Sequence, residues 1–290
     1  MVNLEKIKAE KSINELLEFS IINIDKPSGP TSFGVDQIIK KALNIEKTSH
    51  FGTLDPGVTG VLPVALSRAC KLMPYFIGKD KTYVGILRVH KEISLENLQK
   101  TADKFTGKIN QTPPRKSRVK RVERKRTVYN FKITEQDENN KNNFIFEAKV
   151  EAGTYIRKLI HDLGILIGGA HMLELRRTQA SIFSEENSID IYRFLEIVEE
   201  YNNGNELFLR NIIIPGEIIS NVLPIIEVKK EYIKKLQHGS PLLKEYIKSN
   251  KIPDEEKLAV FNGNTFIGVF RTTNEETILA RPEYVFQPIK

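Results

Sequence analysis

A change in the spacing of apolar residues near the middle of the chain is the feature that most restricts the fold. Residues 142–153, NNFIFEAKVEAG, are apolar at every second position, which is typical of a strand with one buried face. Gly153 then breaks the strand, Thr154 can cap a helix, and apolar residues follow helical spacing over 156–167. Residues 81–90 predict another strand. Because strands are joined both directly and through helices, we expect a mixed α+β sheet domain.

The C-terminal quarter of the chain has a different pattern. From residue 222 onward, short β-like segments alternate with turns, and Asn262-Gly263-Asn264 is a strong hairpin signal. A length of 290 residues also favours two domains. We therefore predict an N-terminal arm over 1–20, a sheet domain over 21–221 and a small β-barrel or sandwich over 222–290.

Two segments rich in glycine and proline interrupt the sheet domain. Residues 27–30 predict a turn, after which Ser32 could cap a helix. Residues 50–66, HFGTLDPGVTGVLPVAL, can form neither a regular helix nor an uninterrupted strand, so we expect a shaped loop. Asp55 lies inside this loop, where the backbone can bend tightly and approach a ligand. From the dipeptide alone, however, an aspartate before proline more often closes a turn by bonding its own backbone.

The positive charge of the chain is confined to one segment. The formal net charge is +7, and residues 115–126, RKSRVKRVERKR, carry that whole surplus through eight basic residues and one acidic residue. Such runs are often solvated faces. Here Val119 and Val122 interrupt the run and a β-like stretch follows, so we expect a structured hairpin or loop. Its basic side chains would neutralise phosphates with little sequence preference; they are Arg115, Lys116, Arg118, Lys120, Arg121, Arg124, Lys125 and Arg126.

Several classes of protein are excluded by what the sequence does not contain. The single cysteine, Cys70, cannot form an internal disulfide or a four-thiolate zinc site, which favours a reducing, cytoplasmic location. The N-terminus mixes Glu and Lys and fits neither a signal peptide nor a transit peptide. No apolar run reaches the roughly 20 residues of a membrane helix. His161 and Asp162 are adjacent on a predicted helix and diverge, so no metal site is expected.

Five segments, in order along the chain, carry a resemblance to a known family. They are INIDKPSGPTS (22–32), HFGTLDPGVTGVLPVAL (50–66), KTYVG (81–85), VEAGTYIRKLIHDLG (150–164) and HMLELRRTQ (171–179). With them the chain resembles the pseudouridine synthases of the TruB and dyskerin family. The resemblance implies an α+β pseudouridine synthase fold with a mixed, mainly antiparallel central sheet. The C-terminal segment is similar to the PUA RNA-binding module, a small β-barrel.

The resemblance also implies an active site. Asp55 corresponds to the catalytic aspartate, which attacks the target uridine covalently so that the base can detach, rotate and rejoin through carbon. Arg157 matches the arginine that pairs with this aspartate, and an adjacent guanidinium favours the charged carboxylate. Tyr83 matches the tyrosine that stacks on the flipped base and takes part in proton transfer. His50 corresponds to a histidine near the RNA, and we assign it to binding. The chemistry requires no metal and no cofactor.

RNA-binding residues outside the active site are implied in the same way. The basic segment resembles the family's thumb-like loop, at about residues 110–128, which closes over RNA. Within it we expect contacts from Arg118, Lys120, Arg121, Arg124, Lys125 and Arg126. In the PUA-like module the resemblance points to His238, Gly239 and Leu242 as the place where the ACA end of a guide RNA would bind.

Within the family, the motifs look closest to the archaeal catalytic subunit of the H/ACA ribonucleoprotein. The expected partners are then a box H/ACA guide RNA, a substrate rRNA or tRNA, and the accessory proteins of the particle, with no membrane. The chain lacks the long lysine-rich tail of the eukaryotic proteins, which favours an archaeal, cytoplasmic form. Two alternatives stay open: a stand-alone enzyme that modifies the T-loop uridine of tRNA, and a non-catalytic RNA-binding scaffold.

Overall fold

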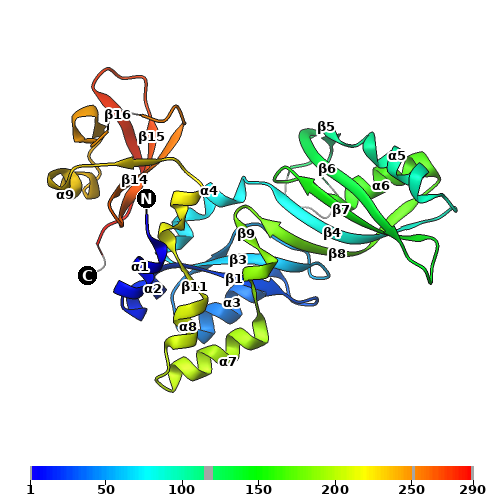
Figure 1. Cartoon of the computed structure of the whole chain (residues 1–290), viewed down its shortest axis with the longest axis horizontal. Helices are drawn as coiled ribbons and strands as arrows, with labels where there is room; N and C mark the ends of the chain where they lie inside the picture. The colour runs from blue at the N-terminus through cyan, green and yellow to red at the C-terminus, as the bar shows by residue number, and fades with distance from the viewer. Residues whose placement is uncertain (1, 114–119, 250–251, 289–290) are drawn as a thin grey trace.

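Two β-sheets form the framework of the protein (Figure 1). The computed structural model describes residues 2–113, 120–249 and 252–288. Within these residues a main sheet has eleven strands, of which eight follow the order β10-β1-β3-β8-β4-β7-β6-β5. Most neighbours are antiparallel, whereas β3 pairs with β8 and β1 with β10 in parallel. The predicted mixed α+β architecture is therefore confirmed.

The main sheet combines longer strands with short ones. The long strands are β1 (Phe19–Lys26), β3 (Thr59–Ser67), β4 (Lys81–Val89), β5 (Gly107–Gln111), β6 (Arg124–Gln136), β7 (Asn143–Val150) and β8 (Ala170–Ala180). The short strands are β2 (Thr48–His50), β9 (Phe183–Ser184), β10 (Ile189–Asp190) and β11 (Ile213–Pro215). The predicted strands at 81–90 and 142–153 correspond to β4 and β7.

Helices bury the apolar side chains of the main sheet in one large core, here called the main core. Its buried members include Ile39, Leu98, Leu159 and Phe194, each from a different helix. The helices are α2 (Ile13–Glu18), α3 (Ser32–Ala42), α5 (Leu95–Asp103), α6 (Ile156–Ile167), α7 (Ile191–Asn202) and α8 (Leu207–Ile212). Together they fix the long strands that carry the site residues described below.

Both predicted helix caps are wrong by one position. The N-cap of α3 is Thr31, whose hydroxyl accepts from the N–H of Gly34, while Ser32 lies within the helix and turns its hydroxyl to another loop. The N-cap of α6 is Tyr155, which makes no side-chain capping bond, and the hydroxyl of Thr154 is buried. For Ser32 a tertiary hydrogen bond to Leu54 determines where the hydroxyl points.

The expected loop over 50–66 is only partly a loop. Strand β3 begins at Thr59 and runs through Pro63, antiparallel to the whole of β1. Gly60 fits there because its φ is +101° and because a Cβ at this position would lie 2.2 Å from the carbonyl oxygen of Arg177 on β8. The glycine therefore permits a close approach of two strands, which a turn signal in the sequence cannot reveal.

The second sheet is formed by the C-terminal segments, in the order β12-β14-β15-β16-β13. Its strands are β12 (Ile225–Glu227), β13 (Leu242–Leu243), β14 (Lys257–Asn262), β15 (Thr265–Thr272) and β16 (Ile278–Val285), with a short helix α9 (Ile233–Gln237). Asn262 pairs with Thr265, so the predicted hairpin is confirmed.

An aromatic cluster joins the two sheets. Phe19 of β1 stacks on Phe266 of β15, with ring centroids 5.5 Å apart, and lies 4.2 Å from the ring of Phe286. The same apolar cluster includes Phe76 of α4 (Met73–Ile77) and Ile219 of the 3-10 turn η3 (Gly216–Asn221). Because residues of both sheets share this core, the second sheet is packed against the main sheet and not merely tethered to it.

The N-terminal arm is also packed against the rest of the chain. It contains α1 (Leu4–Glu10) and α2, and β1 already begins at Phe19, inside the range expected for the arm. Arg210 of α8 donates to the carbonyls of Lys8 and Lys11, both at 2.7 Å. The amine of Lys11 in turn pairs with the buried Glu217.

Candidate active site

Asp55 and Arg157, 102 residues apart in sequence, meet in an ion pair. The Nη2 of Arg157 donates to Oδ2 of Asp55 at 2.5 Å. Asp55 lies in the turn before β3, between the buried side chains of Leu54 and Val58, and Arg157 is the second residue of α6. Both side chains are about half exposed, at 53% and 55%. The buried side chains of Leu54 and Val58 therefore fix the turn in the protein, while the carboxylate of Asp55 stays accessible.

Lys26, which the sequence analysis did not single out, holds the Asp55 turn in place. It is fully buried at the end of β1, and its amine donates to the carbonyls of Pro27 (2.7 Å), Pro30 (2.9 Å) and Pro56 (3.0 Å). Burial lowers the pKa of Lys26, and the charge of Asp55 opposes that shift. The one signal for this role was its place in the segment 22–32.

Two further contacts fasten the same pair of loops. The hydroxyl of Ser32 donates to the carbonyl of Leu54 at 2.9 Å and accepts from the N–H of Leu54 at 2.8 Å. The N–H of Gly29, which has a φ of +113°, donates to the carbonyl of Pro56 at 2.9 Å. The residues on both sides of Asp55 are thus hydrogen-bonded to the loop that follows β1.

Arg177 supports the other end of this segment from within β8. Its exposed fraction is 1%, its Nε donates to the carbonyl of Val61 at 2.8 Å, and its Nη2 donates to the carbonyl of Gly52 at 2.9 Å. Lys81 lies beside it and is also buried. Burial and the charge of Arg177 lower the pKa of Lys81 to about 8. Both cations serve the backbone and are not available to a ligand.

The start of α6 is positioned by Gln111, the last residue of β5. The buried Gln111 accepts from the N–H of Tyr155 at 3.0 Å and donates to the carbonyl of Tyr155 at 3.3 Å. Arg157 follows two residues later, at a helix end where the dipole disfavours a cation. The ion pair with Asp55 offsets that cost, so the position of α6 and that of the Asp55 turn depend on each other.

Tyr83 lies on β4, partly buried against the main core. It pairs with Arg177 on β8, and Arg177 pairs on its other side with Gly60 of β3. Tyr83 and Gly60 are therefore at the same level of the sheet, about 10 Å apart across two strand spacings. Within the described chain Tyr83 makes no hydrogen bond to Asp55 or Arg157. The structure brings it to the same region without direct contact.

His50 is held at both ring nitrogens. Its Nδ1 lies 2.7 Å from Oδ2 of the buried Asp36, and its Nε2 lies 3.0 Å from the hydroxyl of Thr53. An RNA contact through Nε2 would therefore replace the bond to Thr53. The sequence analysis did not single out Asp36.

The basic segment connects β5 and β6, which pair from Gly107 opposite Val128 to Gln111 opposite Arg124. We call β5, β6 and the connecting residues 112–123 the basic hairpin. Arg118 lies outside the described residues, as do Arg115 and Lys116. Lys120, Arg121 and Lys125 are exposed, and Arg124 is half-buried.

Arg126 differs from the other cations of the basic hairpin. Its side chain is 20% exposed, and its guanidinium lies 3.6 Å from the carboxylate of Glu151. A Cβ added to Gly153 would lie 3.1 Å from its Nη2. Arg126 thus binds the loop that precedes α6, and of the predicted RNA contacts on β6 it is the most engaged within the chain.

The three residues predicted to bind RNA in the second sheet differ in exposure. His238 ends α9 and is exposed, with its Nδ1 2.5 Å from the carbonyl of Lys234. Gly239 follows with a φ of +88°. Leu242 is fully buried in the core of the second sheet, so a contact with RNA could involve only its backbone.

Comparison with known proteins identifies the family. Residues 40–96 match the TruB family pseudouridylate synthase N-terminal domain, residues 157–219 match the tRNA pseudouridylate synthase B C-terminal domain, and residues 70–165 match the Pus10 C-terminal domain. A "Probable tRNA pseudouridine synthase B" of Methanothermobacter thermautotrophicus is 41% identical over 236 residues, which cover 81% of this chain and 72% of the relative. The chain belongs to the TruB family. A TruB relative of Pyrobaculum calidifontis with the same printed name is 39% identical over 241 residues, covering 82% of this chain and 71% of the relative.

The fold is also similar to solved structures of this family. A chain in the crystal structure of a Cbf5-Nop10-Gar1 complex superposes with a TM-score of 0.88 at 33% identity, covering 97% of this chain and 89% of the solved one. A chain in the structure of an H/ACA RNP bound to a substrate RNA gives 0.87 at 32% identity, with the same coverage. The protein is thus an RNA pseudouridine synthase of the TruB/Cbf5 type, an enzyme that isomerises uridine to pseudouridine. In the described ranges no helix has the length and apolarity needed to cross a membrane.

Proposed function

We propose that the protein isomerises uridine in RNA at Asp55, as the guide-RNA-dependent catalytic subunit of an H/ACA particle. The observation that carries the catalytic assignment is the exposed ion pair of Asp55 and Arg157 on a turn that Lys26 and Ser32 anchor from below. Such preorganisation is what a nucleophile needs.

In the proposed reaction the Asp55 carboxylate forms an ester bond to C1′ of the target uridine as the bond from C1′ to N1 of the base breaks. The base rotates, and its C5 bonds to C1′ and releases the carboxylate. The C5 proton is then lost, and N1 takes up a proton. Arg157 holds the carboxylate in orientation and supplies the opposite charge. The uridine must leave its stack to reach Asp55. Tyr83, at the level of Gly60 on the sheet, would present its ring to the flipped base, and stacking of this kind contributes roughly 1 to 3 kcal/mol.

The guide-dependent assignment is supported by the extent of the structural similarity. Solved chains that superpose over 97% of this protein come from complexes whose titles name Nop10, Gar1 and an H/ACA RNP with substrate RNA. We infer that the second sheet, residues 222–290, is a PUA module that binds the guide RNA near His238 and Gly239. Residues 21–221 would form the catalytic domain, and accessory proteins would bind to it. The basic hairpin would cover the substrate.

The names of the archaeal relatives favour a second candidate function. They describe probable tRNA pseudouridine synthases, and by this second proposal the present chain would act on tRNA without a guide. The purified protein, assayed on an unmodified tRNA transcript with and without an H/ACA guide and accessory proteins, distinguishes the two. Product on tRNA alone at the rate of the assembled particle would reverse our preference.

The catalytic assignment is tested with Asp55→Asn. This variant keeps the shape of the side chain and removes the nucleophile, so pseudouridine formation should fall by more than about 1,000-fold while RNA binding is retained. Asp254→Asn, at an exposed residue of the C-terminal region, is the matched control. Full activity of Asp55→Asn would refute the assignment. Tight RNA binding by the wild-type protein without activity on any guide or tRNA would instead support a scaffold.

A further inference from the structure

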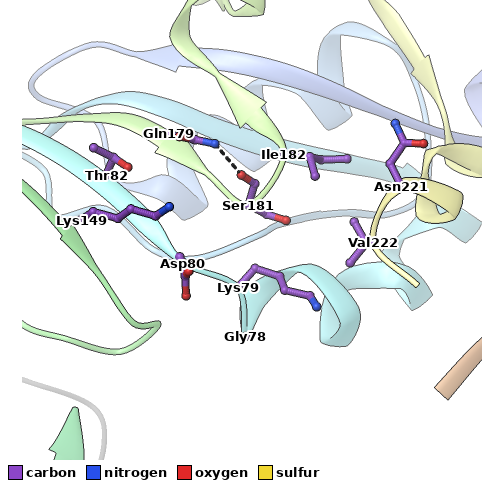
Figure 2. A pocket seen from close by; sticks show the side chains of 10 residues that line it. All are labelled: Gly78, Lys79, Asp80, Thr82, Lys149, Gln179, Ser181, Ile182, Asn221 and Val222. Atoms are coloured by element: carbon purple, nitrogen blue, oxygen red, sulfur yellow. Dashed lines mark hydrogen bonds between the residues drawn. The ribbon is translucent and has the colours of Figure 1, made fainter. Parts of the chain in front are cut away.

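A polar cavity of about 280 Å³ lies where the main sheet meets the segment leading to the second sheet (Figure 2). We call it the junction pocket. Its walls come from the turn before β4, from β4, β7 and β8, from the turn after β8, and from the end of η3. The side chains used below are Lys79, Asp80, Thr82, Lys149, Gln179 and Ser181.

Strand register aligns three of these side chains. Thr82 of β4 is paired with Lys149 of β7 on one side and with Gln179 of β8 on the other. Directly paired residues project from the same face of a sheet. An ammonium, a hydroxyl and an amide thus form a row across three neighbouring strands, and Figure 2 shows the amine of Lys149 directed toward Asp80 and Gln179.

Apart from the amide of Gln179, which donates to the carbonyl of Ser181 at 3.1 Å, the side-chain donors named above have no partner within the described part of the chain. Over the described ranges, the amines of Lys79 and Lys149 and the hydroxyls of Thr82 and Ser181 make no hydrogen bond or ion pair. The buried cations of the Asp55 site behave in the opposite way, since Lys26, Lys81 and Arg177 donate to backbone carbonyls. Unused donors around a cavity are available to an anion.

The one carboxylate among the lining residues is turned toward the basic hairpin. Burial and the nearby carboxylate of Asp80 raise the pKa of Tyr129. Tyr129 lies on β6 and is 47% exposed. The pocket therefore has two ammonium groups and one carboxylate. The exposed ring of Tyr129 lies near that carboxylate.

We propose that the junction pocket binds a phosphate of the RNA backbone through Lys79 and Lys149. This inference rests on the proposed function, because it adds a contact for the same RNA. One wall of the pocket, at Asn221 and Val222, leads directly into the second sheet, and Lys149 is paired with Asn130 on β6 of the basic hairpin. The pocket therefore lies between the segment that leads to the second sheet and β6, where an RNA bound at both places could be contacted.

The test is the salt dependence of RNA affinity for the full-length protein. In Lys79→Gln/Lys149→Gln the side-chain length is nearly kept and two charges are lost. Because one phosphate contact is lost, the slope of log affinity against log salt should fall by about 0.7 for single-stranded and about 0.9 for double-stranded RNA. Over a fourfold rise in salt, the wild type should lose about 2.6- to 3.5-fold more affinity than the variant. An H/ACA hairpin transcript and a tRNA transcript are each titrated.

Two further variants sharpen the result. Lys41→Gln/Lys104→Gln removes two exposed lysines, one on α3 and one at the end of α5. This control should leave the salt dependence of RNA affinity unchanged. Asp80→Asn, which retains an acceptor for Tyr129, should tighten RNA binding. An unchanged slope in the pocket variant, or weaker binding in Asp80→Asn, overturns the proposal. If inorganic phosphate stabilises the wild type but not the pocket variant while the slopes agree, the pocket binds free anions and the RNA assignment is wrong.

The same titrations in an Asp55→Asn background separate this inference from the proposed function. The slope difference does not depend on turnover, so it should persist in the inactive protein. Full activity of Asp55→Asn would refute the catalytic assignment and leave the pocket result standing. Loss of activity together with equal slopes would refute the pocket alone.

Discussion

Replacement of the buried Lys26 by methionine tests whether the Asp55 turn is preorganised by the amine below it. Methionine matches the length of the lysine stem but donates no hydrogen bond. The carbonyls of Pro27 and Pro30 would then lose the one donor that the described structure gives them, whereas that of Pro56 keeps the N–H of Gly29. The variant therefore loosens the turn without opening a large cavity.

The expected loss of stability follows from these bonds. A buried acceptor without a donor costs about 1 to 3 kcal/mol, and less where water can enter. Both prolines are half-buried, and removing an ammonium whose pKa is lowered by burial offsets part of the loss. We expect a net loss of about 2 kcal/mol, which for a chain of this size corresponds to a fall in melting temperature of roughly 4 to 8 °C.

The effect on catalysis should be larger than the effect on folding at the assay temperature. If the turn loses its support, kcat at saturating RNA should fall at least about tenfold, equivalent to about 1.4 kcal/mol of lost positioning, while KM changes little. Pseudouridine formation and thermal unfolding are measured on the same preparations. Lys47→Met, at an exposed lysine, is the control. A Lys26→Met protein with wild-type melting temperature and kcat would refute the argument.

Three other substitutions give independent tests. Gln111→Ala should lower kcat about tenfold because the backbone of Tyr155, which positions α6, loses both of its bonds to the amide, and Gln111→Glu should recover only the one that accepts from the N–H. The pKa of Lys81 is about 8 in the folded protein against 10.5 in the unfolded chain, so the unfolded chain binds more protons between these pH values. The contribution of Lys81 to the free energy of unfolding therefore rises with pH across that range, by at most about 3 kcal/mol. Thermal unfolding of Lys81→Met should lack that rise; a parallel rise in both proteins would contradict the assignment. Gly60→Ala should prevent folding or lower the melting temperature by more than about 6 °C, since its Cβ would overlap the backbone of β8, whereas Gly57→Ala has open space and should be neutral in circular dichroism melts.

The elements that were predicted correctly are those whose pattern is local. Strands β4 and β7 alternate along their length, and the turn at Gly263 has a defined chemistry. Strand β8 was not predicted, because its sequence HMLELRRTQ does not alternate and two of its arginines make internal contacts. Arg176 binds Asp25 and Glu185, and Arg177 binds the backbone carbonyls of Val61 and Gly52. Those contacts arise only when distant segments come together.

The same distinction applies to the site. Asp55, Tyr83 and Arg157 could be named from the sequence because family motifs contain them. Lys26 and Gln111 could not be assigned a role, since a buried lysine that bonds three carbonyls looks in sequence like any surface lysine. Burial decides whether a lysine or arginine donates to backbone carbonyls or is free to bind a ligand. That burial cannot be read from the local sequence around the residue.

The aromatic contact between Phe19 and Phe266 has a consequence for how a target would be chosen. Phe19 begins the strand that ends at Lys26, and Lys26 donates to the carbonyl of Pro56 next to Asp55, so a continuous path of packed and hydrogen-bonded residues connects the second sheet to the Asp55 turn. An RNA bound at the second sheet would then place at Asp55 the nucleotide that lies at a fixed distance from that binding site. On that reasoning the distance between the second sheet and Asp55 selects the target uridine. Phe266→Ala should therefore cause modification of neighbouring uridines before it lowers the reaction rate.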